Sequence, residues 1–153
     1  DRDIHELLEF LHCKGNLLGI DGNRICLWAC SGNVMTALQA LTEVERPYAS
    51  SIKCGVLYYP VFSDLQRNLV DVNAVIERSL RKDLPLLLVE VGKEHLEFRR
   101  GAELFTEKIH STGMPLEHIY YADGVHGFDS QMDNPETRRI VRRTLDYMQQ
   151  HLS

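Results

Sequence analysis

Four short apolar runs, each followed by apolar residues at helical spacing, constrain the fold of this chain most strongly. The predicted strands are Arg24–Ala29, Lys53–Tyr59, Leu86–Val91 and Leu116–Tyr121. The helical repeats that follow them start at Val34, Val72, Ala102 and Ile140. This alternation predicts an α/β protein with a parallel sheet of about four βα units, right-handed crossovers and helices on both faces.

The ends of the chain carry two further helix signals. Ile4, Leu7, Leu8 and Leu11 lie at helical spacing before Gly15, which predicts a first helix of about three turns. Asn134 as a cap, with proline next to it in the first turn, predicts the start of the last helix. A length of 153 residues fits one compact domain, so residues 1–153 are interpreted as a single unit.

Composition and charge exclude several classes of protein. The net charge of -5 favours a solvated helix face over a nucleic-acid site for the arginines at 138, 139, 142 and 143. No apolar run approaches the roughly 20 residues that cross a bilayer, and Asp1–Asp3 is not the basic start of a signal peptide. We therefore expect no nucleic-acid or membrane partner.

The cysteines and histidines are mostly given structural interpretations. Cys13, Cys26, Cys30 and Cys54 lack metal-site spacing, which favours reduced thiols in a cytoplasmic protein without a metal. Surface positions are expected for four histidines, namely His5, His110, His118 and His151.

Three polar residues follow the predicted strands in the order nucleophile, acid, base: Ser31, Glu94 and His126. Ligands of parallel sheets bind beyond the carboxyl ends of the strands, where these residues fall. Helical spacing resumes at Val34 with almost no connection, so the turn around Ser31 must be sharp. Such a turn presents the serine above the sheet and leaves the Gly32 amide at a helix N-terminus, where it can hold an oxyanion.

Each of these assignments has an alternative. Ser31 can be a simple helix cap, and Glu94 an exposed loop residue. Cys30 is an alternative nucleophile, although centring the turn on it puts Trp28 where only a small residue fits. Asp64, in the loop after the second predicted strand, competes with Glu94 as the acid.

Three stretches carry a resemblance to a known family. They run from Gly19 to Asn33, from Pro85 to Glu94 and from Gly124 to Asp129. The chain resembles the dienelactone-hydrolase-like esterases of the α/β-hydrolase fold over nearly its whole length. The nucleophile turn of that fold reads G-x-S-x-G, and Ala29 and Asn33 replace its glycines here.

The resemblance implies a serine hydrolase that cleaves small carboxylic esters without a metal or organic cofactor. Ser31 would attack, His126 would transfer the proton, Glu94 would orient His126 and Gly32 would stabilise the oxyanion. Family members usually have Asp as the acid. In dienelactone hydrolase itself a cysteine takes the nucleophile position, and this supports Cys30 as the alternative nucleophile.

The fold normally begins with about four more strands and a loop that supplies a second oxyanion donor. The chain therefore resembles the C-terminal half of an α/β-hydrolase, and we expect one side of the nucleophile strand to be bare. Such an edge invites homo-oligomerisation or pairing with another strand. The alternative function is a catalytically inactive hydrolase-fold fragment or binding module.

Overall fold

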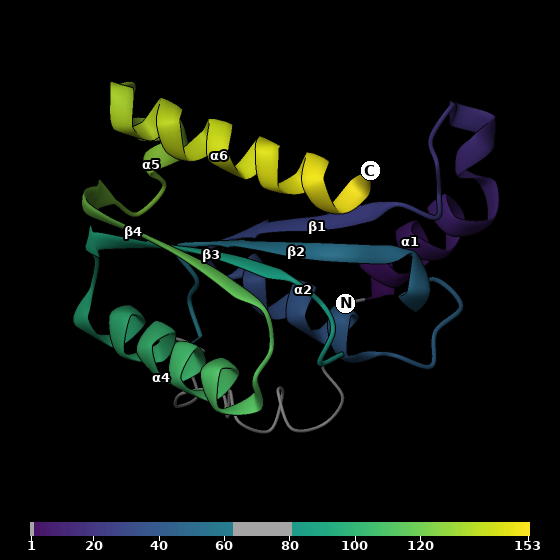
Figure 1. Ribbon diagram of the computed structural model, residues 1–153, viewed down its shortest axis with the longest axis horizontal. Coiled ribbons are helices and arrows are strands. Elements are labelled where there is room, and N and C mark those ends of the chain that lie inside the picture. The colour runs from purple at the N-terminus through teal and green to yellow at the C-terminus, as the bar shows by residue number, and fades with distance from the viewer. Residues whose placement is uncertain (1, 63–80) are drawn as a thin grey trace.

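The structure, a computed structural model, describes residues 2–62 and 81–153. Its strands are β1 (Ile25–Cys30), β2 (Ile52–Tyr58), β3 (Leu86–Lys93) and β4 (Leu116–Val125). They form one sheet in the order β1-β2-β3-β4, and every neighbouring pair is parallel. Figure 1 shows this sheet as a central layer with helices on both sides. The predicted fold class is confirmed.

Four of the five α-helices in the described residues agree with the apolar spacing that predicted them, and α5 is the exception. The five helices are α1 (Arg2–Lys14), α2 (Asn33–Thr42), α4 (Leu96–Thr112), α5 (Phe128–Gln131) and α6 (Pro135–Leu152), with short 3-10 helices at Gly15–Leu18 and Ala49–Ser51. The Asn134 side chain accepts the N–H of Thr137 at 2.9 Å, as expected of a cap. The predicted helix around Val72 lies outside the described residues.

Two elements near the C-terminus differ from the prediction. Strand β4 continues four residues beyond Tyr121, through small and polar residues that carry no apolar signal. Its pairing with β3 continues to the Lys93–Val125 pair, so backbone hydrogen bonding holds this extension. Helix α5 is a single turn inside a segment predicted to be a loop, and one turn is too short to show a period.

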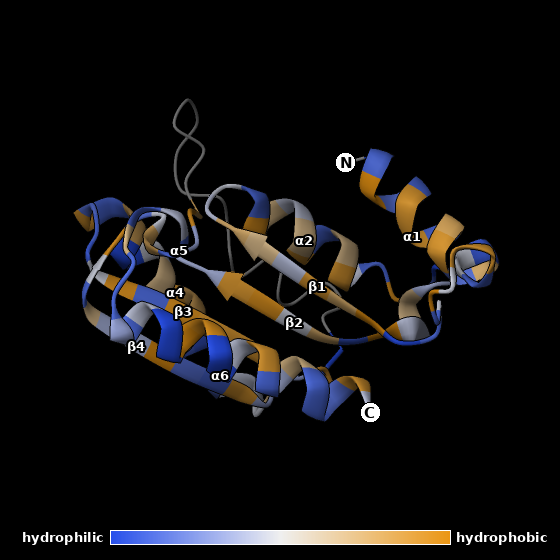
Figure 2. Cartoon of the chain, turned by 90° about the horizontal axis from the view of Figure 1, so that it is seen from above, coloured by the Kyte–Doolittle hydropathy of each residue, from blue (hydrophilic) through white to orange (hydrophobic). Residues whose placement is uncertain are grey.

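The core consists of two apolar layers, one on each face of the sheet. Alternate residues of β3 point to opposite faces, so Leu86 and Leu88 join one layer and Leu87 and Val89 the other. Helices α2 and α4 cover the first face and α6 covers the second (Figure 1). Figure 2 shows strongly hydrophilic residues along the outer side of α6. Burial on both faces explains why the strands read as continuous apolar runs.

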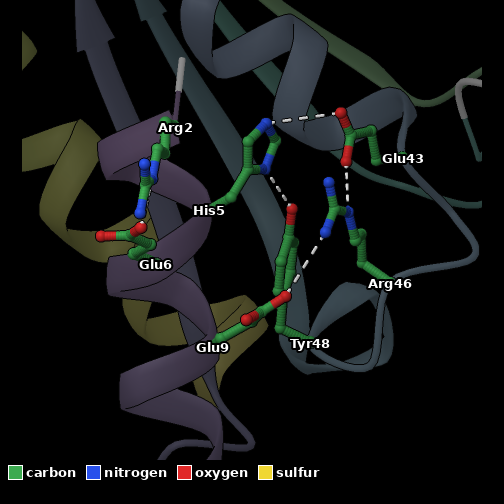
Figure 3. A network of polar contacts seen from close by, with 7 residues as sticks. All are labelled: Arg2, His5, Glu6, Glu9, Glu43, Arg46 and Tyr48. Atoms are coloured by element: carbon green, nitrogen blue, oxygen red, sulfur yellow. Dashed lines mark hydrogen bonds and ion pairs between the residues drawn. The ribbon is translucent and has the colours of Figure 1, made fainter.

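Helix α1 places Leu8 in the apolar core and also makes polar contacts with the segment after α2. His5 is hydrogen-bonded to the Tyr48 hydroxyl at 2.6 Å and lies 3.3 Å from a Glu43 oxygen, and Arg46 bridges Glu43 and Glu9 (Figure 3). The His5 side chain is only 13% exposed, so its interpretation as a surface residue was wrong. The sequence did not indicate this burial, because the polar partners of His5 lie far away along the chain and leave no local pattern.

Strand β1 is an edge of the sheet among the described residues, because it pairs with β2 and with no other described strand. Trp28, in this strand, is 38% exposed, which is high for a large apolar side chain in a sheet. The described structure therefore has the bare strand edge that the resemblance to the α/β-hydrolase fold led us to expect.

Gly92 is required where β3 and β4 change register. The regular pairing shifts between Val91 and Lys93, and a Cβ added at Gly92 would lie 2.1 Å from the carbonyl oxygen of Ala122. Backbone cannot move away as a flexible side chain can. This close approach lies near the end of β3, two residues before Glu94.

We predict that Gly92→Ala lowers the free energy of unfolding by about 1–3 kcal/mol, because the methyl group overlaps backbone atoms. Gly32→Ala is the matched control, since Gly32 has helical angles (φ -61°, ψ -25°) and no atom within 4 Å of an added Cβ. Urea unfolding followed by circular dichroism measures both. Equal stability of the two variants would contradict the close approach.

Candidate active site

Ser31, Glu94 and His126 occupy equivalent places in the sheet. Strand β1 ends at Cys30, β3 at Lys93 and β4 at Val125, so each of the three residues directly follows a strand. Because the strands are parallel, these positions share one rim of the sheet. The structure thus brings together three residues that are far apart in the sequence.

Ser31 sits in a sharp strand-to-helix turn. Its φ of 58° lies in the left-handed region, which is unfavourable for serine by about 1–2 kcal/mol. The turn is held by the Ser31 N–H, which donates to the Tyr58 carbonyl (3.0 Å), and by the Ser31 carbonyl, which accepts from Val34 (3.2 Å). Strain of this kind is concentrated at functional sites.

The Ser31 hydroxyl does not cap α2. The N-cap residue is Gly32, without a side-chain cap, and the Ser31 Oγ is instead 2.8 Å from Nε2 of His126. The interpretation of Ser31 as a simple helix cap is therefore wrong. Asn33 starts the helix, and Ala29 packs into the buried layer beneath the turn, so both residues that replace the usual glycines fit their positions.

His126 connects Ser31 to Glu94. Its Nδ1 lies 2.5 Å from Oε2 of Glu94, and the other carboxylate oxygen accepts the N–H of His95 at 2.8 Å. A carboxylate only accepts hydrogen bonds, so the Nδ1 must carry the proton and Nε2 is then free to accept from Ser31. The Glu94 side chain is only 6% exposed, whereas that of His126 is 34% exposed. Glu94 is thus not the exposed loop residue of the alternative interpretation.

The segment after β4 shapes the backbone around His126. Gly127 has a φ of 75°, which favours glycine, and the Gln131 side chain donates to the His126 carbonyl at 2.8 Å. Phe128 is fully buried and anchors α5 against the sheet. The chain therefore changes direction directly after His126, where α5 begins.

The Cys30 side chain lies on the face of the sheet that α6 covers. It is partly buried against the apolar layer there, and its thiol lies near the Tyr59 hydroxyl. Burial raises the pKa of the thiol, which disfavours the nucleophilic thiolate. Asp64, the alternative acid, lies outside the described residues. The contacts of Cys30 favour Ser31 as the nucleophile.

The Gly32 amide lies at the N-terminus of α2. Among residues 2–62 and 81–153, no acceptor is hydrogen-bonded to it. An unpaired N–H beside a serine hydroxyl is available to an oxyanion, and the helix dipole adds to the positive potential there.

Two aromatic residues near the imidazole were not singled out from the sequence. The rings of Tyr59 and Phe98 have their centroids 4.8 and 6.0 Å from that of His126. His118 is exposed at the surface as expected, and its Nε2 lies 3.1 Å from a Glu90 carboxylate oxygen. These contacts join residues of different elements of the fold, so no local pattern in the sequence predicts them.

The described residues hold neither a candidate metal cluster nor a helix that could span a bilayer. No group of three or more His, Cys, Asp or Glu residues among them is arranged to hold a metal ion. None of the helices in the same part of the chain is long and apolar enough to cross a bilayer.

The sequence matches no protein-family model and no curated protein. Solved structures, however, are similar. A thermostable carboxylesterase from a metagenomic library has a TM-score of 0.75 and 18% identity, over 99% of this chain and 63% of that one. A fungal esterase from Rhizomucor miehei has a TM-score of 0.77 and 15% identity, over 99% of this chain and 59% of that one.

A third structure, an α/β-hydrolase from a deep-sea metagenome, has a TM-score of 0.74 and 15% identity, over 98% of this chain and 63% of that one. These similarities show that the chain has a partial α/β-hydrolase fold. It spans about three-fifths of the length of each of these proteins (63%, 59% and 63%).

The thiol environment gives a direct test of the two candidate nucleophiles. We predict that iodoacetamide at pH 8 modifies the exposed Cys13 faster than Cys30, because partial burial shields the Cys30 thiol and its raised pKa lowers the thiolate fraction. Peptide mass spectrometry over a time course measures both rates, with the urea-unfolded chain as control. Equal rates in the folded protein would show that Cys30 is reactive.

Proposed function

We propose that this chain is a serine hydrolase that cleaves small carboxylic esters through an acyl-enzyme. The hydrogen-bonded series Ser31–His126–Glu94, with distances of 2.8 and 2.5 Å, carries this proposal. Ser31 is the nucleophile, His126 the general base and acid, and Glu94 the residue that orients the imidazole. The esterases among the similar structures support ester hydrolysis as the reaction class.

Acylation begins when the Ser31 Oγ attacks the carbonyl carbon of the ester and its proton passes to Nε2 of His126. The carbonyl oxygen becomes an oxyanion that the Gly32 amide stabilises. When the tetrahedral intermediate collapses, the bond to the alcohol oxygen breaks, and His126 returns the proton to that oxygen. The alcohol leaves, and Ser31 carries the acyl group.

Deacylation repeats these steps with water. His126 removes a proton from the water molecule, whose oxygen attacks the acyl carbon, and the proton then returns to Ser31 as the carboxylic acid leaves. Glu94 stabilises the imidazolium that forms in both halves of the reaction. No step requires a metal or an organic cofactor.

The finer assignment is to the dienelactone-hydrolase-like esterases, in the cytoplasm. Its support is the three stretches of sequence described above, whereas the glutamate acid and the nucleophile turn without glycines depart from the usual pattern of that family. The bare edge of β1 is the proposed surface for self-association or for pairing with another strand.

A fluorophosphonate probe tests the nucleophile. We predict that the folded chain is labelled, that Ser31→Ala abolishes labelling, and that hydrolysis of p-nitrophenyl acetate by this variant falls by about 10⁴–10⁶-fold. Cys30→Ala should keep the label. Ser111→Ala, on the exposed side of α4, is the matched control for a lost hydroxyl.

The same experiment separates the proposal from its alternative. A chain that has a native circular dichroism spectrum but takes up no probe is the inactive fragment or binding module. Labelling that disappears in Cys30→Ala and persists in Ser31→Ala assigns the nucleophile to the thiol instead.

The acid has a test of its own. Glu94→Gln keeps the size of the side chain but presents an amide to Nδ1, so the imidazole loses the carboxylate that fixes its tautomer. We predict a fall in kcat of about 10³–10⁴-fold with little change in KM, because the loss is greatest in the transition state. Steady-state kinetics measure it. An unchanged kcat would point to Asp64 as the acid.

A further inference from the structure

The His126 ring packs against a tyrosine that directly follows β2. The centroid of the Tyr59 ring lies 4.8 Å from that of the imidazole, and the two planes are inclined by 60°. Tyr59 is only 7% exposed, so a buried ring lies beside a histidine that is itself partly open to solvent. Contact between the two rings limits the rotation of the imidazole about its own side-chain bonds.

The hydroxyl of Tyr59 holds the segment that follows the imidazole. It donates to Oδ1 of Asp129 at 2.6 Å, and Asp129 lies in the first turn of α5, three residues after His126. One phenol therefore links the end of β2 to the segment that carries the imidazole.

The backbone of Tyr59 is held in an unfavourable conformation. Its φ is 34°, a value that tyrosine adopts only when the surrounding structure imposes it. The Tyr59 N–H donates to the Val89 carbonyl at 2.7 Å, and two residues later the N–H of Val61 donates to the Ser31 carbonyl at 3.3 Å. With this backbone conformation, the Tyr59 side chain lies at the carboxyl end of the strands, against the ring of His126.

We propose that Tyr59 is a positioning residue that holds His126 in its two hydrogen bonds, to Ser31 and to Glu94. The proposal rests on the proposed function, in which His126 is the base. Its mechanism has two parts, because the ring limits the tilt of the imidazole and the hydroxyl fixes the Asp129 end of the segment. Burial raises the pKa of Tyr59 far above its usual range, so the hydroxyl remains a donor wherever the site works.

Tyr58 offers a matched control one residue away. Its hydroxyl is also buried, and it is hydrogen-bonded at 2.6 Å to Thr144 in α6. Tyr58→Phe and Tyr59→Phe therefore each remove one buried phenolic hydrogen bond from neighbouring positions. A purely structural role would give the two variants the same effect.

The first readout is the tautomer of His126, measured by long-range ¹H–¹⁵N correlation spectra of the imidazole and assigned by its loss in His126→Gln. We expect Nδ1–H to dominate in the original chain and in Tyr58→Phe, because Glu94 accepts that proton. In Tyr59→Phe we expect a larger fraction of Nε2–H, the form that a histidine released from Glu94 adopts. This readout does not depend on esterase activity.

The second readout is kinetic. With p-nitrophenyl acetate, Tyr59→Phe should lower kcat by about 10–100-fold and change KM by less than about twofold, since misplacement of the base affects the chemical step. Tyr58→Phe should keep kcat within about twofold of the original.

The outcomes separate the two proposals. An unchanged tautomer ratio in Tyr59→Phe, or an equal change in both variants, overturns the role of Tyr59 even if the chain is an active esterase. A tautomer shift confined to Tyr59→Phe supports that role, even if the probe experiment shows that the chain is not an esterase.

Discussion

All strands of this sheet run in the same direction, and the site depends on that single constraint. Parallel pairing places the residues after β1, β3 and β4 on one rim, whatever their separation in the sequence. Even so, β1 and β4 are three strands apart, which is on the order of 14 Å at an interstrand spacing of about 4.8 Å. The contact between Ser31 and His126 therefore also needs the extension of β4 and the turn at α5.

The acid shows how the structure accommodates a change in side-chain length. Glutamate is one methylene longer than the aspartate that family members usually carry. Glu94 nevertheless places its carboxylate within hydrogen-bonding distance of Nδ1 of His126. Its second oxygen accepts the His95 N–H, so both oxygens of this nearly buried carboxylate have partners. A buried carboxylate without partners would be costly. The register shift at Gly92 lies just before the end of β3, two residues before Glu94.

Apolar spacing was sufficient to predict the strands and most of the helices, because burial on both faces of the sheet leaves a strong and local pattern. The features that were missed have no such pattern. Helix α5 is a single turn, the extension of β4 is held by backbone pairing, and His5 is partly buried by contacts with residues about 40 positions away, such as Tyr48. The contact between Tyr59 and His126 is of the same long-range kind.

By itself, the sequence determined the order of elements, the sharp turn at Ser31 and the three polar residues that follow strands. These are local properties, since periodicity, turn residues and strand ends are encoded within a few neighbouring positions. Only the tertiary structure decided that the Ser31 hydroxyl meets His126 and that Glu94 reaches the imidazole, while the Cys30 thiol turns toward Tyr59. Side-chain direction depends on strand register, on twist and on packing between distant segments, and none of these is written in adjacent residues.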